Sequence, residues 1–286
     1  MLYDKVSSLF RCFFVSTINF SFWPDLGNHF TVSYNNRQET GYIALCALFK
    51  KALEVNIPIT ECDFYLNSSY ENVKSIFIGD DGHLIPMFDA RYECLLESAK
   101  VLKEKFAGSF LECLKIADGS AKNLLCLILK HFTSFRDYAE YDGRTGRFSF
   151  LKRAQILISD VYHAFNGRKP ADFTDLDVLT MFADYRVPQV LAYFGVLKYD
   201  GSLSQILEKN QFLENGNPME VEIRGCSIFA VEEIVEKVNE MLLKIDCNAS
   251  KINAASLDYF LWNYRRAHAA EIEEKFPFHK TRCIYY

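Results

Sequence analysis

Several common catalytic and cofactor signatures are missing from this chain of 286 residues. It contains no G-x-G-x-x-G or Walker-type phosphate loop, no H-E-x-x-H zinc motif and no G-x-S-x-G nucleophile motif. Its nine cysteines include no C-x-x-C pair, which argues against a zinc site or a disulfide framework and fits reduced thiols in a cytosolic protein. We therefore expect no metal, no cofactor and no serine nucleophile.

Long apolar runs and concentrated positive charge are also missing. No segment approaches the roughly 20 apolar residues that span a bilayer, and the run Leu9–Val15 is interrupted by Arg11 and lacks a signal-type cleavage site. The net charge is −5, with both signs mixed along the chain, whereas a duplex-binding protein needs a basic face. We expect a soluble, cytoplasmic monomer whose substrate is a small molecule, with no direct nucleic-acid or membrane partner.

What the chain does contain is apolar and aromatic material in helical patterns. Half of its residues are hydrophobic, with 25 Phe and 16 Tyr, enough for a thick core or a pocket that stacks a flat ligand. Apolar residues recur at spacings of three and four, which predicts amphipathic helices. The helices predicted in this way cover 92–106, 151–165, 231–242 and 255–268.

Strand signals are fewer and lie early in the chain. Phe30–Tyr34 alternates, Asn35-Asn36 supplies turn residues, and Gly41-Tyr42-Ile43 is the expected return strand of a short hairpin. Asp142-Gly143-Arg144 is expected to form a turn. The predicted class is therefore mainly α with a small β-hairpin element. We expect residues 1–286 to form a single large domain, either undivided or as two helical lobes with the pocket between them.

The segment Thr180–Gln189 places polar residues between apolar stretches. Pro188 suits the first turn of a helix and disfavours helical geometry at Val187, so a helix is expected to start here. A carboxylate at Asp184, just before that start, would feel the positive end of the helix dipole, stay ionised, and be able to stabilise a cationic transition state or attack a carbon. The alternative is a structural N-cap bridged to Arg186, which composition and spacing alone favour.

Three further stretches mix polar and aromatic residues. Asn19–Trp23 offers amide and hydroxyl groups among rings that would stack a planar base or fill the core. Glu220–Ser227 alternates charged and apolar residues, as a strand or extended loop would. Asp258 lies on a predicted helix, either as a ligand acceptor or as a salt-bridge partner. His279 and Cys283 are four residues apart, but two ligands do not make a metal site, and a surface His near a buried Cys is the simpler interpretation.

Taken together, these stretches closely resemble the queuosine salvage protein family. The resemblance is carried by Asn19–Trp23, Thr180–Gln189, Glu220–Ser227 and the terminal Arg282–Tyr286, with Lys152–Leu157 and Ile57–Thr60 adding to it. It runs from about Phe14 to the C-terminus. It implies an N-glycosidase that releases queuine from queuosine 5'-monophosphate, with the nucleoside as a poorer substrate, on a fold similar to that of the helix-hairpin-helix DNA glycosylases.

The resemblance also implies roles for individual residues. The catalytic carboxylate near a helix start corresponds to Asp184. Asn19, Phe182 and Asp258 lie in matching motifs and are expected to contact the ligand: Asn19 as a donor to the base, Asp258 as a partner for its cationic amine. Because the base is a 7-deazaguanine, it lacks the N7 that purine hydrolases protonate. The 5'-phosphate needs a basic group, with four unranked candidates: Arg186, Arg224, Lys152 and Arg153.

The chain departs from the family pattern in two ways. Family members usually carry a further N-terminal helical stretch of some tens of residues, whereas this chain begins almost at the Asn19 motif, and Ser16 stands where the family commonly has Asp. Two alternatives to a hydrolase of queuosine 5'-monophosphate stay open: a non-catalytic queuosine- or queuine-binding protein, and a nucleic-acid base glycosylase, against which the acidic net charge argues.

Overall fold

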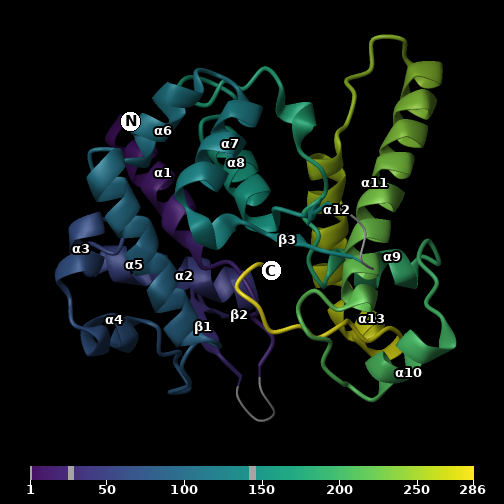
Figure 1. Ribbon diagram of the computed structural model, residues 1–286, viewed down its shortest axis with the longest axis horizontal. Coiled ribbons are helices and arrows are strands. Elements are labelled where there is room, and N and C mark those ends of the chain that lie inside the picture. The colour runs from purple at the N-terminus through teal and green to yellow at the C-terminus, as the bar shows by residue number, and fades with distance from the viewer. Residues whose placement is uncertain (1, 25–28, 142–145) are drawn as a thin grey trace. The chain divides into compact units, whose positions relative to one another are not determined.

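The computed structural model describes residues 2–24, 29–141 and 146–286 of the chain. In these residues there are 13 α-helices, two 3-10 helices and two antiparallel hairpins (Figure 1), so the prediction of a mainly α protein is confirmed. The chain divides into two compact units: unit 1 comprises residues 1–136, 156–175 and 285, and unit 2 comprises residues 137–155, 176–284 and 286. The turn expected at Asp142–Arg144 lies outside the described residues.

Unit 1 is built from helices and one hairpin. In chain order its elements are α1 (Leu2–Thr17), β1 (Thr31–Tyr34), β2 (Arg37–Thr40), α2 (Gly41–Glu54), α3 (Cys62–Asn67), α4 (Tyr70–Ile76), α5 (Phe88–Lys105), α6 (Phe110–Ala117), α7 (Ala121–His131), η1 (Thr133–Phe135) and most of α8 (Lys152–Ala164). Helix α1 packs against α2, α5 and α6. The predicted helix 92–106 is thus confirmed within the longer α5.

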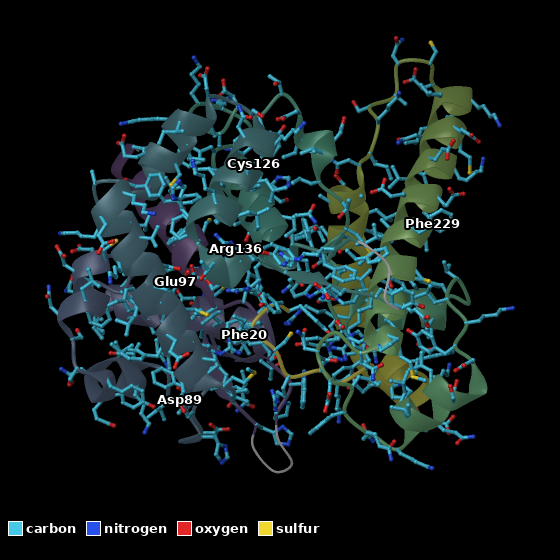
Figure 2. The ribbon with its side chains drawn as sticks, in the orientation of Figure 1. Phe20, Asp89, Glu97, Cys126, Arg136 and Phe229 are labelled. Carbon is cyan, nitrogen blue, oxygen red and sulfur yellow. The ribbon has the colours of Figure 1, made fainter. Side chains whose placement is uncertain are left out.

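The core of unit 1 is aromatic, as the Phe content indicates. Phe13 of α1 stacks on Phe110 of α6 with ring centroids 4.6 Å apart, and it meets the edge of Phe132 at 5.3 Å. All three rings are fully buried. Around this core, helix ends are closed by side chains: Glu97 of α5, labelled in Figure 2, accepts hydrogen bonds from the backbone of Thr133 and Ser134 at η1.

The predicted hairpin exists, but its return strand lies directly before the residues where it was expected. Asn35 and Asn36 both adopt left-handed φ angles of 49° and 60°, and Tyr34 pairs directly with Arg37. This two-residue turn leaves no room for a longer loop, so the return strand is β2. The placement of that strand at Gly41-Tyr42-Ile43 was therefore wrong, because these residues begin α2.

Unit 2 carries the second hairpin and the C-terminal helices. Its elements are β3 (Tyr138–Ala139), β4 (Phe148–Ser149), the first turn of α8, η2 (Leu176–Val178), α9 (Val187–Tyr193), α10 (Gly201–Glu208), α11 (Pro218–Ile245), α12 (Ala254–Ala267) and α13 (Ala269–Lys275). Helix α9 lies at the centre and packs against α11, α12 and α13. Its buried Val187, Val190 and Leu191 join Val221 and Leu261 in one apolar core.

The helix predictions for this half of the chain are confirmed by α8, α11 and α12, but Glu220–Ser227 is helical, so the expectation of a strand or extended loop was wrong. Asn217 caps α11 and Pro218 opens it. Glu220, Arg224 and Ser227 then fall on one buried face at helical spacing.

The segment from His279 to Cys283 is not helical, and His279 is buried, not on the surface. Within the described residues, no helix is long and apolar enough to cross a membrane.

Candidate functional site

Asp184 lies at the start of α9, where the sequence predicted it. Its Oδ1 accepts hydrogen bonds from the backbone N–H groups of Arg186 at 2.7 Å and Val187 at 3.0 Å. These donors would otherwise be unsatisfied at a helix start. Among the described residues no hydrogen bond reaches Oδ2, although the side chain is only 9% exposed. The carboxylate is therefore oriented by one oxygen and leaves the other available. The side-chain bridge to Arg186, which belonged to the structural alternative, is not among the ion pairs of the described residues, where Arg186 pairs with Glu273 instead.

Asp258 of α12 lies beside this segment. Its Oδ2 accepts a hydrogen bond of 3.0 Å from the backbone N–H of Phe182, and both residues are buried. The pKa of Asp258 is raised well above its ordinary value, first because burial disfavours the charged form and then because Asp184 carries a like charge nearby. The structure thus brings Phe182, Asp184 and Asp258 together.

Lys152, the first residue of α8, completes this buried group of charges. Burial lowers its pKa to about 8, Asp184 and Asp258 oppose that effect, and Arg153 adds to it. Gln155, one turn further along, ties α8 to the same segment. Its side-chain oxygen accepts from the Thr180 N–H at 2.7 Å, while its Nε2 donates to the Phe150 carbonyl at 2.8 Å. A cation and two carboxyl groups are therefore held together away from water.

Arg224 of α11 binds the residue before Asp184, and each of its three guanidinium nitrogens donates a hydrogen bond. Its Nη1 and Nη2 donate to the two carboxylate oxygens of Asp137 at 3.0 and 2.6 Å, Nη1 also reaches Glu220 at 3.3 Å, and Nε donates to the Ala183 carbonyl at 2.9 Å. Burial lowers the pKa of Arg224, but Asp137 and Glu220 outweigh burial and raise it overall. As a candidate phosphate ligand Arg224 is therefore set aside, because each of its nitrogens already donates.

Arg186 points its guanidinium away from the oxygens of Asp184 and toward α13. Its Nη1 lies 3.0 Å from Glu273 and 3.2 Å from Gln189, and the group stacks on the Phe278 ring at 4.1 Å. Arg265 converges on the same two partners, Glu273 and Gln189. Burial, and then the neighbouring Arg186, lower the pKa of Arg265 to about 10. The two arginines thus form a cationic pair around one carboxylate.

Asn19 belongs to unit 1, where it is buried just after α1. The carbonyls on either side of it are held by Arg91 of α5, which donates to Ile18, Phe20 and Ser21. The guanidinium of Arg91 also lies over the rings of Phe20 and Phe22, at 4.4 and 4.8 Å. Arg91 thus holds the backbone on both sides of Asn19.

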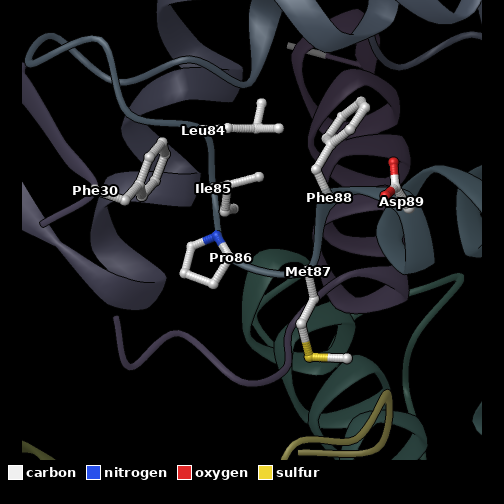
Figure 3. Close-up of a pocket in the computed structure, with 7 residues that line it drawn as sticks. All are labelled: Phe30, Leu84, Ile85, Pro86, Met87, Phe88 and Asp89. Atoms are coloured by element: carbon white, nitrogen blue, oxygen red, sulfur yellow. The ribbon is translucent and has the colours of Figure 1, made fainter. Parts of the chain in front are cut away.

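Unit 1 also contains a small pocket. It has a volume of about 250 Å³ and is lined by residues that include Phe30, Pro86, Met87 and Asp89 (Figure 3). The Asp89 carboxylate accepts a hydrogen bond from the hydroxyl of Tyr70. No candidate site residue of the sequence lines this pocket, so we assign it no role. In the described parts of the chain, no three His, Cys, Asp or Glu residues are grouped to hold a metal ion.

Sequence reasoning missed several residues of the site. Asp137, Glu220 and Tyr286 around Arg224 were not singled out, nor were Gln189, Arg265 and Glu273 around Arg186. Glu220 and Arg224 could have been paired from their i,i+4 spacing had the segment been recognised as helical. Asp137 gives no such signal, because it lies 87 residues from its partner Arg224.

Comparison with known proteins places this chain in a family. The family model described as "Queuosine salvage protein" matches residues 5–286. Among the similar proteins are those named "Queuosine 5'-phosphate N-glycosylase/hydrolase" from Mus musculus, 44% identical over 96% of this chain and 80% of that protein, and from Bos taurus, 42% identical over the same shares. The protein of that name from Schizosaccharomyces pombe is 36% identical over 98% of this chain and 84% of its own length. The chain is a member of the queuosine salvage protein family.

Proposed function

We propose that this chain is an N-glycosidase that hydrolyses queuosine 5'-monophosphate, and queuosine less well, to release queuine for salvage into tRNA modification. The observation that carries the proposal is the arrangement of Asp184. Its carboxylate is held by two backbone N–H groups through one oxygen, receives no hydrogen bond at the other oxygen from the part of the chain that the structure describes, and is largely withdrawn from water. The names of its relatives supply the substrate class.

The chemistry follows from the bond that has to break. Cleavage of the bond between the ribose carbon and the base nitrogen builds positive charge on the sugar. A fixed, desolvated carboxylate stabilises that charge more strongly than water does, and it needs no reorganisation during the reaction. Water then supplies the hydroxyl to the sugar carbon and the proton to the base. In this proposal Asp184 faces the sugar.

The remaining contacts of the substrate are part of the same proposal. Phe182 stacks the base, Asn19 donates to it, Arg186 is a candidate for the phosphate, and Asp258 holds the cationic amine of queuine. Burial raises the pKa of the Asp258 carboxyl and so favours its neutral form. A bound ammonium group supplies the missing countercharge, so substrate binding is expected to release a proton there.

We also propose a fold relationship and a cellular location for the chain. The helical packing around the carboxylate at a helix start is consistent with a fold like that of the helix-hairpin-helix DNA glycosylases. We place the protein in the cytoplasm, where thiols stay reduced, in agreement with the free thiols of Cys113, Cys126, Cys226 and Cys247.

One experiment tests the function. Purified protein and its Asp184→Asn variant are incubated with queuosine 5'-monophosphate and released queuine is measured. The asparagine oxygen can still accept from Arg186 and Val187, so the fold is expected to survive while kcat falls on the order of 100- to 1,000-fold. Asp200→Asn is the matched control, because Asp200 caps α10 in the same way, by accepting from the Leu203 N–H at 2.7 Å.

The outcomes separate the alternatives. No queuine from the wild type, together with binding of the nucleotide, would identify a binding protein and refute the enzyme. Equal turnover by wild type and Asp184→Asn would refute the role of Asp184. Loss of turnover in Asp200→Asn to the same extent would show that helix capping, and not the charge of Asp184, explains the loss.

A further inference from the structure

Asp184 and the two residues before it are held by three different helices. The N–H of Phe182 donates to Asp258 of α12 at 3.0 Å, the carbonyl of Ala183 accepts from Arg224 of α11 at 2.9 Å, and Asp184 itself is bound to the start of α9. The anchor from α11 contacts the residue directly before Asp184, and it does so through the backbone carbonyl alone. Its effect on Asp184 is therefore one of position.

The same guanidinium also fixes the start of α8. Arg224 binds Asp137 through both carboxylate oxygens, and Asp137 Oδ2 also accepts the backbone N–H of Lys152 at 3.1 Å. A bidentate pair of this kind defines both distance and orientation. Lys152, whose ammonium group is electrostatically coupled to Asp184 and Asp258, is consequently set in place by the same arginine as the Asp184 segment.

Arg224 is itself held rigidly. The rings of Phe150 and Tyr286 each lie 4.0 Å from the guanidinium carbon. The Tyr286 hydroxyl donates to Glu220 at 2.7 Å, and Glu220 pairs with Arg224 one helical turn away. Arg224 is 1% exposed and Glu220 is fully buried. Because every polar group in this cluster is satisfied, the cluster has little freedom to move.

We propose that Arg224 is a positioning residue: by binding the Ala183 carbonyl and Asp137 together, it holds Asp184 and Lys152 in one fixed arrangement. The catalytic consequence rests on the proposed function, whereas the geometric consequence does not. Arg224 contacts no reacting atom in this scheme. It acts through backbone groups, and a misplacement of about 1 Å at the reacting carboxylate is enough to cost roughly 100-fold in rate.

The first test is independent of turnover. Hydrogen exchange is measured at the amides of Arg186, Val187 and Lys152 in the wild type and in Arg224→Lys, which keeps the charge and loses the bidentate fork. We expect at least tenfold faster exchange at all three amides. The matched control is Ser227→Ala, which removes a buried hydrogen bond to Ile223 from the same face of α11. Unchanged exchange in Arg224→Lys, or equally fast exchange in Ser227→Ala, overturns the proposal.

The second test measures kinetics on queuosine 5'-monophosphate. Arg224→Lys and the isosteric Asp137→Asn are expected to lower kcat about 100-fold with KM within about twofold, while Ser227→Ala keeps kcat. Asp137→Asn also stands in if Arg224→Lys does not fold. A purely structural cluster would lower the melting temperature and leave kcat per folded molecule unchanged, which contradicts the proposal. An inactive wild type with the predicted exchange pattern refutes the proposed function alone.

Discussion

At the scale of single residues, two carboxyl groups of the candidate site differ in hydrogen bonding and burial. Asp184 receives two backbone N–H groups at a helix start, whereas Asp258 receives one and is more deeply buried. Burial, and then the charge of Asp184, raise the pKa of Asp258. Neighbouring carboxyl groups in unlike environments are the usual way in which one site holds an ionised and a neutral acid at the same pH.

This difference predicts how stability depends on pH. Asp258 binds its proton more tightly in the folded chain than in the unfolded chain, so its contribution is fully present below the unfolded pKa and is lost as the pH rises above it. Asp258→Asn keeps an acceptor for the Phe182 N–H and cannot ionise. We expect its free energy of unfolding, relative to that of the wild type, to increase between pH 4 and pH 7, as measured by urea unfolding.

A control of opposite sign is available in unit 1. Hydrogen bonds from Lys51 and from the Ser33 backbone lower the pKa of Asp80 to about 2. That contribution is present above the unfolded pKa and disappears as the pH falls toward 2, so Asp80→Asn should lose stability relative to the wild type as the pH rises from about 2 to about 4, and should change little between pH 4 and pH 7. If the two variants show the same trend, the buried state of Asp258 is not the cause.

At the scale of elements, the four helices predicted from apolar periodicity all exist, whereas the secondary structure of segments rich in polar or turn residues was predicted less well. The start of α9 was correct because Pro188 marks it directly, and Asp184 could be placed beside it. The return strand of the hairpin was misplaced because apolar Gly41-Tyr42-Ile43 opens a buried helix, a role that alternation does not distinguish. Glu220–Ser227 was misjudged because charged residues on a buried helical face look like strand alternation until their distant partner Asp137 is known.

Helix α12, which carries Asp258, begins with a side-chain cap. The Asn253 side-chain oxygen accepts from the backbone N–H of Ser256 at 2.9 Å and from its hydroxyl at 2.8 Å. Asn253→Ala is expected to lower the free energy of unfolding by about 1 kcal/mol. Because α12 is also packed against α9 and α11, kcat should stay within about twofold. A chemical-denaturation curve and a turnover assay on the same sample measure both, and a large fall in kcat would show that the cap, not the packing, sets the position of Asp258.

At the scale of the whole molecule, charge bears on the choice between a nucleotide and a polymer as substrate. The chain carries 32 basic and 37 acidic residues, for a net charge of −5. The arginines near Asp184 are committed to carboxylates: Arg224 to Asp137 and Glu220, and Arg186 and Arg265 to Glu273. Their charge is thereby balanced within the protein, and it does not form the exposed basic face that releases counterions from a phosphate backbone.

This balance predicts the behaviour of the protein toward DNA. In fluorescence anisotropy with a labelled 20-base-pair duplex at physiological salt, no saturable binding is expected up to about 100 μM protein, since non-specific DNA-binding proteins reach Kd values of roughly 10⁻⁴ to 10⁻⁶ M there. Lowering the salt should produce little gain, because few phosphates would be neutralised. Micromolar binding that weakens steeply with salt would instead favour a nucleic-acid glycosylase. In that case the small-molecule substrate would have to be reconsidered, while the proposed role of Asp184 at the sugar would be unaffected, since both reactions cleave the same type of bond.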